Sequence, residues 1–157
     1  MAKGDPVPWL DAEEEAVWLR FMGVVVRLPA ALDTQLRRDS GLSHFEYLTL
    51  AALSMTETRT MRMSDMAAFA EGSLSRLSHA CKRLEADGWL TRQPHPDDGR
   101  VTLATLTDAG YAKVVEAAPG HVRAVRELVF APLTKQQVKQ LGQIAERIDA
   151  AIGPLGT

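Results

Sequence analysis

Cysteine is nearly absent from the 157-residue sequence, in which Cys81 is the single example. One cysteine excludes an internal disulfide framework and a cysteine-rich zinc site, which agrees with a reducing compartment. The longest apolar run, residues 21–26, is far shorter than the ~20 residues of a membrane span, and the first residues lack the apolar core of a signal peptide. We therefore expect a cytoplasmic protein without a membrane-inserted segment.

Motifs of catalysis and metal binding are also missing. The chain has no G-x-S-x-G, no G-x-x-x-x-G-K and no G-x-G-x-x-G pattern. Its four histidines, His44, His79, His95 and His121, lie far apart in sequence and lack H-x-x-x-H spacing. Cys81 falls at a core-facing position of a predicted helix, which favours a packed thiol over a redox sensor. We expect no enzymatic activity, no bound metal and no cofactor.

Net charge is low, with 18 basic against 20 acidic residues and a formal charge of −2. This balance gives no global sign of a nucleic-acid partner. Residues 59–100 carry seven cations and six anions, so this segment is close to neutral as well. Any nucleic-acid function must therefore depend on where individual charges lie.

Apolar residues recur at helical spacing along most of the chain, which predicts a mainly α-helical fold. The first helix is expected to run over 11–38 with a kink near Leu28, caused by Pro29. The second is expected over 44–54, followed by a polar loop at 56–60. Later helices should end at Gly72 and Gly88, and one helix should be interrupted at Pro119–Gly120. The expected N-caps are Asp11, Ser43, Ser64, Ser73, Thr107 and Thr134.

A β-hairpin is predicted near residues 94–107, which read PHPDDGRVTLATLT. Residues 89–93 and 101–106 are rich in β-branched and aromatic side chains and flank the polar stretch. Because the intervening loop is longer than a two-residue turn, we expect it to project with Arg100 at its tip. Gly99 would permit the turn, and Asp98 would hold the guanidinium in position.

Two short helices joined by a glycine-containing turn and followed by a hairpin are typical of a winged helix-turn-helix. The fold class is therefore α+β, mainly α with a small β-hairpin wing. In the second short helix, apolar residues at 77, 80, 81 and 84 predict a buried face. The opposite face carries donors and cations that suit phosphates and base edges, although polar residues there are also typical of a solvated helix. These candidate DNA-binding residues are Ser73, Ser75, Arg76, Ser78, His79, Lys82 and Arg83.

The wing supplies the second group of candidate DNA-binding residues, Asp98, Gly99 and Arg100. A hairpin that enters the minor groove needs a long cation, since the narrow groove concentrates negative potential. Arg100 is suited to that position. The alternative is an ordinary surface loop with an ion pair between Asp98 and Arg100.

The run Asp98-Gly99-Arg100, followed by Leu106-Thr107 and Gly110, resembles the wing signature of the MarR family of bacterial transcription regulators. RLEADGWLTR at 83–92 is similar to the family's passage from recognition helix to wing. The resemblance covers essentially the whole chain, so residues 1–157 are interpreted as a single domain.

The resemblance implies a homodimer in which N- and C-terminal helices, here 11–38 and 108–153, intertwine. It also implies that residues 43–107 form the lobe that binds double-stranded DNA at a pseudo-palindromic operator. Family members are mostly repressors released by small aromatic or phenolic effectors, or by oxidation of a cysteine near the N-terminus, which this chain lacks.

Two questions stay open at this stage. Trp18 and Phe21 are candidates for a ligand cleft, but packing in the core or at a dimer interface suits them as well. The alternative function is a winged-helix protein-interaction module without DNA binding. Salt-dependent binding to duplex DNA separates the two functions, because a protein-only module should show almost none.

Overall fold

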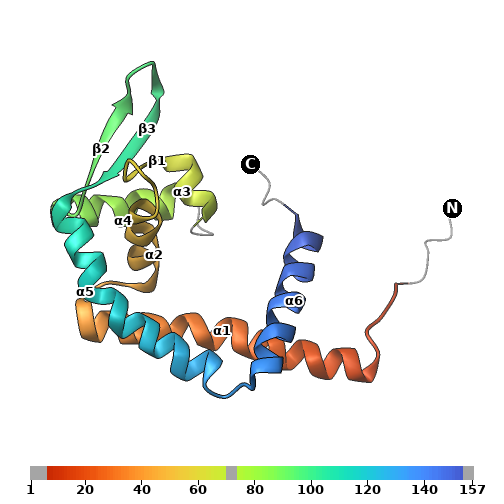
Figure 1. Ribbon diagram of the computed structural model, residues 1–157. Coiled ribbons are helices and arrows are strands. Elements are labelled where there is room, and N and C mark those ends of the chain that lie inside the picture. Colours follow the sequence, from red (N-terminus) through yellow and green to blue (C-terminus); the bar gives the residue numbers. More distant parts are fainter. Residues whose placement is uncertain (1–6, 70–73, 154–157) are drawn as a thin grey trace, which may run out of the picture.

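The computed structural model describes residues 7–69 and 74–153 and places helices around a small sheet (Figure 1). A long base of helices carries a lobe with a projecting hairpin at one end, and the last helix stands apart from the lobe (Figure 1). The elements are α1 (Ala12–Ser40), α2 (His44–Ser54), β1 (Thr60–Arg62), α3 (Met63–Phe69), α4 (Leu74–Ala86), β2 (Leu90–His95), β3 (Asp98–Leu106), α5 (Asp108–Val125), the π-helical turn η1 (Arg126–Phe130) and α6 (Lys135–Ile152).

The helices begin at most of the predicted caps. In a capping box, the N-cap side chain accepts from the N–H of the third helical residue, and that residue's side chain accepts from the N-cap N–H. Capping boxes form at Asp11 with Glu14, Ser43 with Glu46, and Thr134 with Gln137, and Thr107 caps α5 through the N–H of Gly110. The prediction at Ser64 is wrong, because Ser64 is the second residue of α3.

Proline does not interrupt the long helices. α1 continues through Pro29 to Ser40, where Gly41 adopts the left-handed conformation that ends it. The predicted break at Pro119–Gly120 is wrong, since α5 runs through both residues. α5 packs along α1 and α2, and this tertiary packing outweighs the ~3 kcal/mol cost of a proline in a helix interior.

The sheet has three antiparallel strands in the order β1-β3-β2. β2 and β3 form the predicted hairpin. β1 was not predicted and begins at Thr60, which pairs with Thr105 of β3. A three-residue strand is too short to show the alternating pattern that identifies a strand in a sequence.

The hydrophobic core lies within the lobe, between α2, α3, α4 and the sheet, with α1 and α5 closing one side. Cys81 is fully buried in it, and burial raises the pKa of the thiol to about 11, as expected for a packed cysteine. Leu74, the first residue of α4, lies outside this core and is 57% exposed. The largest fully buried apolar side chains are Leu36, Leu42, Leu50, Leu53, Met66, Leu77, Leu84 and Leu90.

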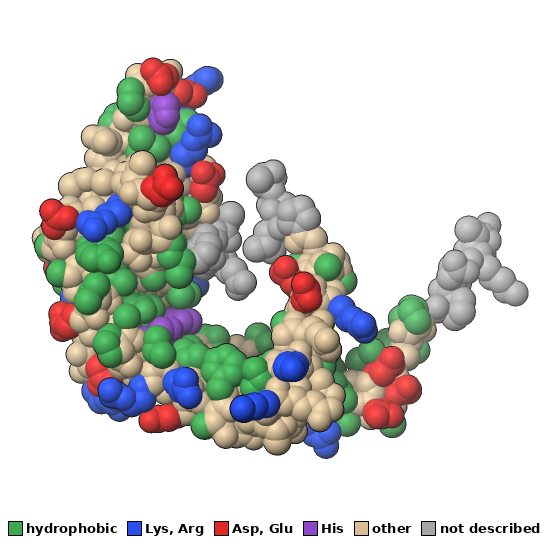
Figure 2. Space-filling model, viewed as in Figure 1, with side chains coloured by type: hydrophobic (Ala, Val, Ile, Leu, Met, Phe, Trp, Pro, Cys, Tyr) green, Lys and Arg blue, Asp and Glu red, His purple; other side chains and the backbone are tan. Residues whose placement is uncertain are grey.

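None of the residues of α6 is buried. Its apolar face, which includes Leu141, Ile144 and Ile148, is exposed. Hydrophobic side chains also gather on the side of the α1 and α5 base that faces the hollow between the lobe and α6 (Figure 2). No helix in the described ranges is long and apolar enough to cross a membrane.

Candidate nucleic-acid interface

α4 presents the two faces that its sequence predicts. Leu77, Ala80, Cys81 and Leu84 are buried against the lobe. Six of the candidate residues lie exposed on the other side, and the seventh, Ser73, lies outside the described residues. The exposed six are Ser75, Arg76, Ser78, His79, Lys82 and Arg83.

Two arginines of α4 contact the first turn of α2. The guanidinium carbon of Arg76 lies 4.5 Å from the centre of the Phe45 ring. Nη2 of Arg83 lies 2.9 Å from Oε1 of Glu46 and 3.2 Å from Oε2 of the same carboxylate. These four side chains line a recess of about 240 Å³ together with His79. One edge of the exposed face of α4 therefore packs against the first turn of α2 through Arg76 and Arg83.

The hairpin is tighter than the sequence suggested. β2 extends to His95 and β3 starts at Asp98, so the turn consists of residues 96 and 97 alone. The pairs Pro94–Thr102 and His95–Asp98 differ in register, which leaves a bulge on β3 over residues 99–101. The placement of Arg100 at the tip is therefore wrong, because Arg100 lies in this bulge just behind the turn. Bulges redirect side chains, and this one leaves the Arg100 side chain 93% exposed.

Asp98 orients Arg100, as the sequence suggested. Its Oδ1 accepts from the backbone N–H of Arg100 at 3.1 Å and from Nε at 3.2 Å. These hydrogen bonds, the backbone one first, lower the pKa of Asp98. Gly99 was expected to permit the turn, but it lies behind the turn and is not among the glycines with a positive φ, so its backbone does not require glycine.

Folding brings together two histidines that are 77 positions apart in the sequence. The rings of His44, in α2, and His121, in α5, have centroids 5.8 Å apart, and His121 lies 4.6 Å from the Tyr47 ring. Nδ1 of His121 is buried without a hydrogen-bond partner among the described residues. The chain's spacing gave no sign of this pair, which only the packing of α5 on α2 creates.

The histidine pair should make stability fall in mild acid. Burial lowers the pKa of both residues below 6.5, and at His121 the neighbouring His44 adds to the effect. Since the unfolded chain binds protons more readily, the stabilisation is present above about pH 6.5 and is lost as the pH falls through the lower folded pKa values. We expect the free energy of unfolding, measured with urea at fixed protein concentration, to decrease from pH 6.5 toward pH 5. His121→Asn should flatten this decrease, whereas the exposed His79→Gln should not; an unchanged slope in His121→Asn would contradict the assignment.

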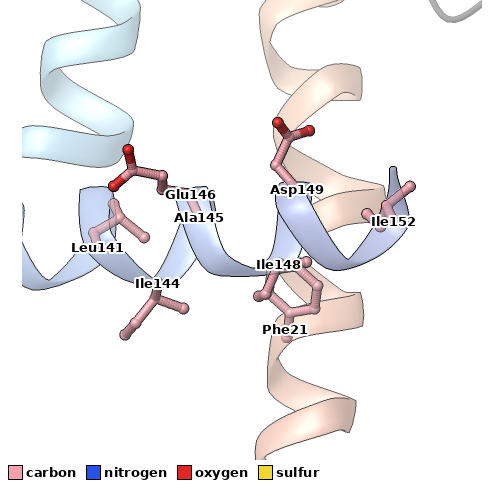
Figure 3. Close-up of a pocket in the computed structure, with 8 residues that line it drawn as sticks. All are labelled: Phe21, Leu141, Ile144, Ala145, Glu146, Ile148, Asp149 and Ile152. Carbon is pink, nitrogen blue, oxygen red and sulfur yellow. The ribbon is translucent and has the colours of Figure 1, made fainter. Parts of the chain in front are cut away.

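Trp18 and Phe21 lie together on α1, with ring centroids 6.3 Å apart, and both are about half exposed. Phe21 also borders an open apolar groove of about 520 Å³, whose other lining residues come from α6. Figure 3 shows Phe21 beside Ile148, with the carboxylates of Glu146 and Asp149 on the other side of α6. Trp18 does not line this groove.

Known proteins show the same fold and sequence pattern. The family model described as MarR family matches residues 42–102, from the start of the lobe to the wing. Sco3205, a MarR family transcriptional regulator from Streptomyces coelicolor whose crystal structure includes DNA, is 43% identical to this chain. The superposition has a TM-score of 0.89 and covers 96% of this chain and 94% of Sco3205. The chain belongs to the MarR family.

Two further transcription regulators are similar to this chain, and the first of them is a MarR family regulator. AbsC from S. coelicolor is 32% identical, with a TM-score of 0.81 over 90% of this chain and 98% of AbsC. The transcriptional repressor IacR from Pseudomonas putida is 28% identical over 59% of this chain, and the match spans only about half (54%) of IacR. The likeness to AbsC thus includes the helices that flank the lobe as well as the lobe itself.

Proposed function

We propose that this MarR protein is a dimeric regulator that binds double-stranded DNA at a pseudo-palindromic operator, acting as a ligand-responsive repressor. The observation that carries the proposal is the 43% identity to Sco3205, a relative crystallised with DNA, over nearly the full length of both chains. The exposed donors and cations on α4 and beside the hairpin turn provide the chemistry that such binding requires.

Within residues 43–107, the proposed DNA-binding lobe, α4 would enter the major groove. Ser75, Arg76, Ser78 and His79 lie toward its N-terminal half, where recognition helices contact base edges. Lys82, one turn further, is suited to a phosphate, and Arg83 is treated separately below. The exposed Arg100, oriented by Asp98, would enter the minor groove.

The remaining helices, in residues 11–38 and 108–153, would form the dimer. The exposed apolar face of α6 and the groove beside Phe21 form a hydrophobic surface that a second copy of the chain would cover. This occupant accounts for Phe21 and Trp18 better than a ligand cleft, since both sit on the helix that borders the groove.

The remaining parts of the proposal come from the family. A small aromatic or phenolic effector would release the protein from DNA, and the protein would act in the cytoplasm where the chromosome lies. The family consists of transcription regulators, and we propose neither catalysis nor a cofactor.

Arg100→Ala should weaken DNA binding broadly across sequences. An operator would first be selected from a random duplex pool, and its half-site spacing compared with one helical turn or a multiple of it. We expect Arg100→Ala to raise Kd about 5- to 150-fold, corresponding to ~1 to 3 kcal/mol. The slope of log K against log salt should also lose about 0.9, since one phosphate-neutralising cation is removed. Fluorescence anisotropy over a salt series measures both.

Gln93→Ala is the matched control, because Gln93 is exposed on the same hairpin and carries no charge. Its Kd and salt slope should equal those of the unchanged protein. Equal affinities for Arg100→Ala and Gln93→Ala would remove Arg100 from the interface. Salt-independent or undetectable binding of the unchanged protein to every duplex would favour the interaction module instead.

A further inference from the structure

Arg76 and Arg83 occupy the same edge of α4 and both dock on α2. They are seven residues apart, which is two helical turns, so their side chains leave the helix on nearly the same side. Their contacts on α2 are adjacent residues, Phe45 and Glu46. An ion pair off the helix axis restrains the rotation of α4, and a second contact two turns away also restrains its tilt against α2.

The Glu46 carboxylate is unusually enclosed for a charged group near the surface, since only 4% of its side chain is exposed. Oε2 accepts from the backbone N–H of Ser43 at 2.8 Å, from the Ser43 hydroxyl at 2.8 Å and from Nη2 of Arg83 at 3.2 Å. Arg83 supplies the opposite charge. A buried carboxylate left without its cation strongly destabilises the folded state, so the pair resists opening.

The start of α2 is in turn held by α1. Oδ1 of Asp33 accepts from the backbone N–H of His44 at 2.9 Å, and Oδ2 of Asp33 pairs with Nε of Arg37 at 2.6 Å. The first turn of α2 is therefore fixed on one side to the long base helix and on the other to α4. It provides a rigid support against which Arg83 can set the position of α4.

Lys82, the residue before Arg83, is not held by an ion pair of this kind among the described residues. It is exposed and makes no ion pair with the part of the chain that the structure describes. A phosphate can take its ammonium group without breaking any contact. In contrast, Nη2 of Arg83 is bonded to Glu46, and moving it to a phosphate would leave the Glu46 carboxylate buried without its cation.

We infer that Arg83 serves DNA binding as a positioning residue acting through Glu46, and not as a contact to DNA. The Arg83–Glu46 pair sets the rotation of α4 so that Ser75, Ser78 and His79 face the groove. This inference rests on the proposed function, and it departs from the initial prediction that every exposed cation of α4 contacts DNA.

The test is a double-mutant cycle on operator binding. Glu46→Gln removes the charge and keeps the capping box, because glutamine serves at that position as well as glutamate. Arg83→Gln and the double variant complete the cycle. We expect each single change to weaken operator affinity about tenfold and the double change to weaken it no further, because coupled residues are not additive. Lys82→Gln is the control. Combined with Glu46→Gln, it should weaken operator affinity by the product of the two separate fold-losses.

A second readout separates positioning from contact in Arg83→Gln alone. A positioning residue should change operator affinity while leaving non-specific affinity and the salt slope unaltered, whereas Lys82→Gln should lower both affinities and reduce the slope by about 0.9. This comparison does not depend on Glu46→Gln, but Arg83→Gln leaves the buried Glu46 carboxylate without its cation, so it is made at a temperature at which Arg83→Gln is folded. Circular dichroism at the assay temperature verifies that each variant is folded, so a mere loss of stability is not mistaken for lost positioning.

Two results would overturn the inference. One is an Arg83→Gln variant that keeps its full loss in the Glu46→Gln background and reduces the salt slope as Lys82→Gln does. The other is a folded Glu46→Gln variant with unchanged operator affinity. Both differ from failure of the proposed function, in which the unchanged protein binds no duplex.

Discussion

Gly110→Ala is expected to destabilise the protein by about 3 kcal/mol, at the upper end of the usual cost of overpacking. A Cβ at position 110 would lie 1.9 Å from the carbonyl oxygen of Trp89 and 2.7 Å from Cδ1 of Leu106. The Trp89 carbonyl also accepts from the N–H of Thr107 at 3.1 Å. Because the clash is with backbone, no rotation of a side chain relieves it, and α5 would have to move away from the base of the wing.

Urea denaturation at fixed protein concentration measures the effect, with Gly99→Ala as the matched control. A Cβ at Gly99 meets no atom within 4 Å, and its φ lies outside the left-handed region. The control should therefore leave the free energy of unfolding almost unchanged. Equal stability of the two variants would mean that α5 does not approach Trp89 and Leu106 as closely as described.

Local signals in the sequence predicted the helices well where they are self-contained. A capping box needs only two residues three positions apart, and the N-caps predicted at Asp11, Ser43 and Thr134 each form one. The buried face of α4 was likewise readable, because four apolar residues recur at helical spacing. The polar side of the same helix was correctly placed at the surface for the same reason.

The errors occur where tertiary contacts decide the outcome. Pro119 stays inside α5 because packing on α1 and α2 supports the helix, and a sequence pattern does not contain that packing energy. The length of the hairpin strands was underestimated because β3 bulges around Arg100 and then resumes pairing at Asp98. β1, with three residues, is too short to show the alternating apolar and polar pattern of a strand.

The candidate site was predicted as a list of residues, without their mutual contacts. Exposure of Arg83 follows from helical periodicity, but its pairing with Glu46, 37 positions away, does not. Glu46 forms its capping box with the nearby Ser43, but its second partner, Arg83, comes from the packing of α4 against α2. The sequence shows the charge and spacing of Lys82 and Arg83. Only the fold shows that Arg83 forms an ion pair with Glu46 and that Lys82 forms none among the described residues.

Ile148→Asp is expected to separate the proposed dimer and to raise operator Kd about 100-fold or more. Ile148 lies beside Phe21 at the apolar groove between α1 and α6, and Leu141 and Ile144 continue the same face (Figure 3). A carboxylate there would be buried without a cation when a second copy covers the face. When one lobe of a dimer is bound, the other lobe is held at a high effective concentration near the second half-site. This raises the operator affinity of the dimer by ~100-fold or more, and a monomer loses that increase.

Gln143→Asp supplies the matched control, since it adds the same charge to α6 on the side away from Ile148, at 100° per residue. Sedimentation equilibrium should give a dimer for the unchanged protein and for Gln143→Asp, and a monomer for Ile148→Asp. The lobe of each monomer should still bind a half-site weakly, because no residue of α6 belongs to the core cluster of the lobe. A dimeric Ile148→Asp variant with full operator affinity would show that another surface joins the two copies. Loss of both half-site binding and the folded lobe would instead show that α6 supports the lobe directly.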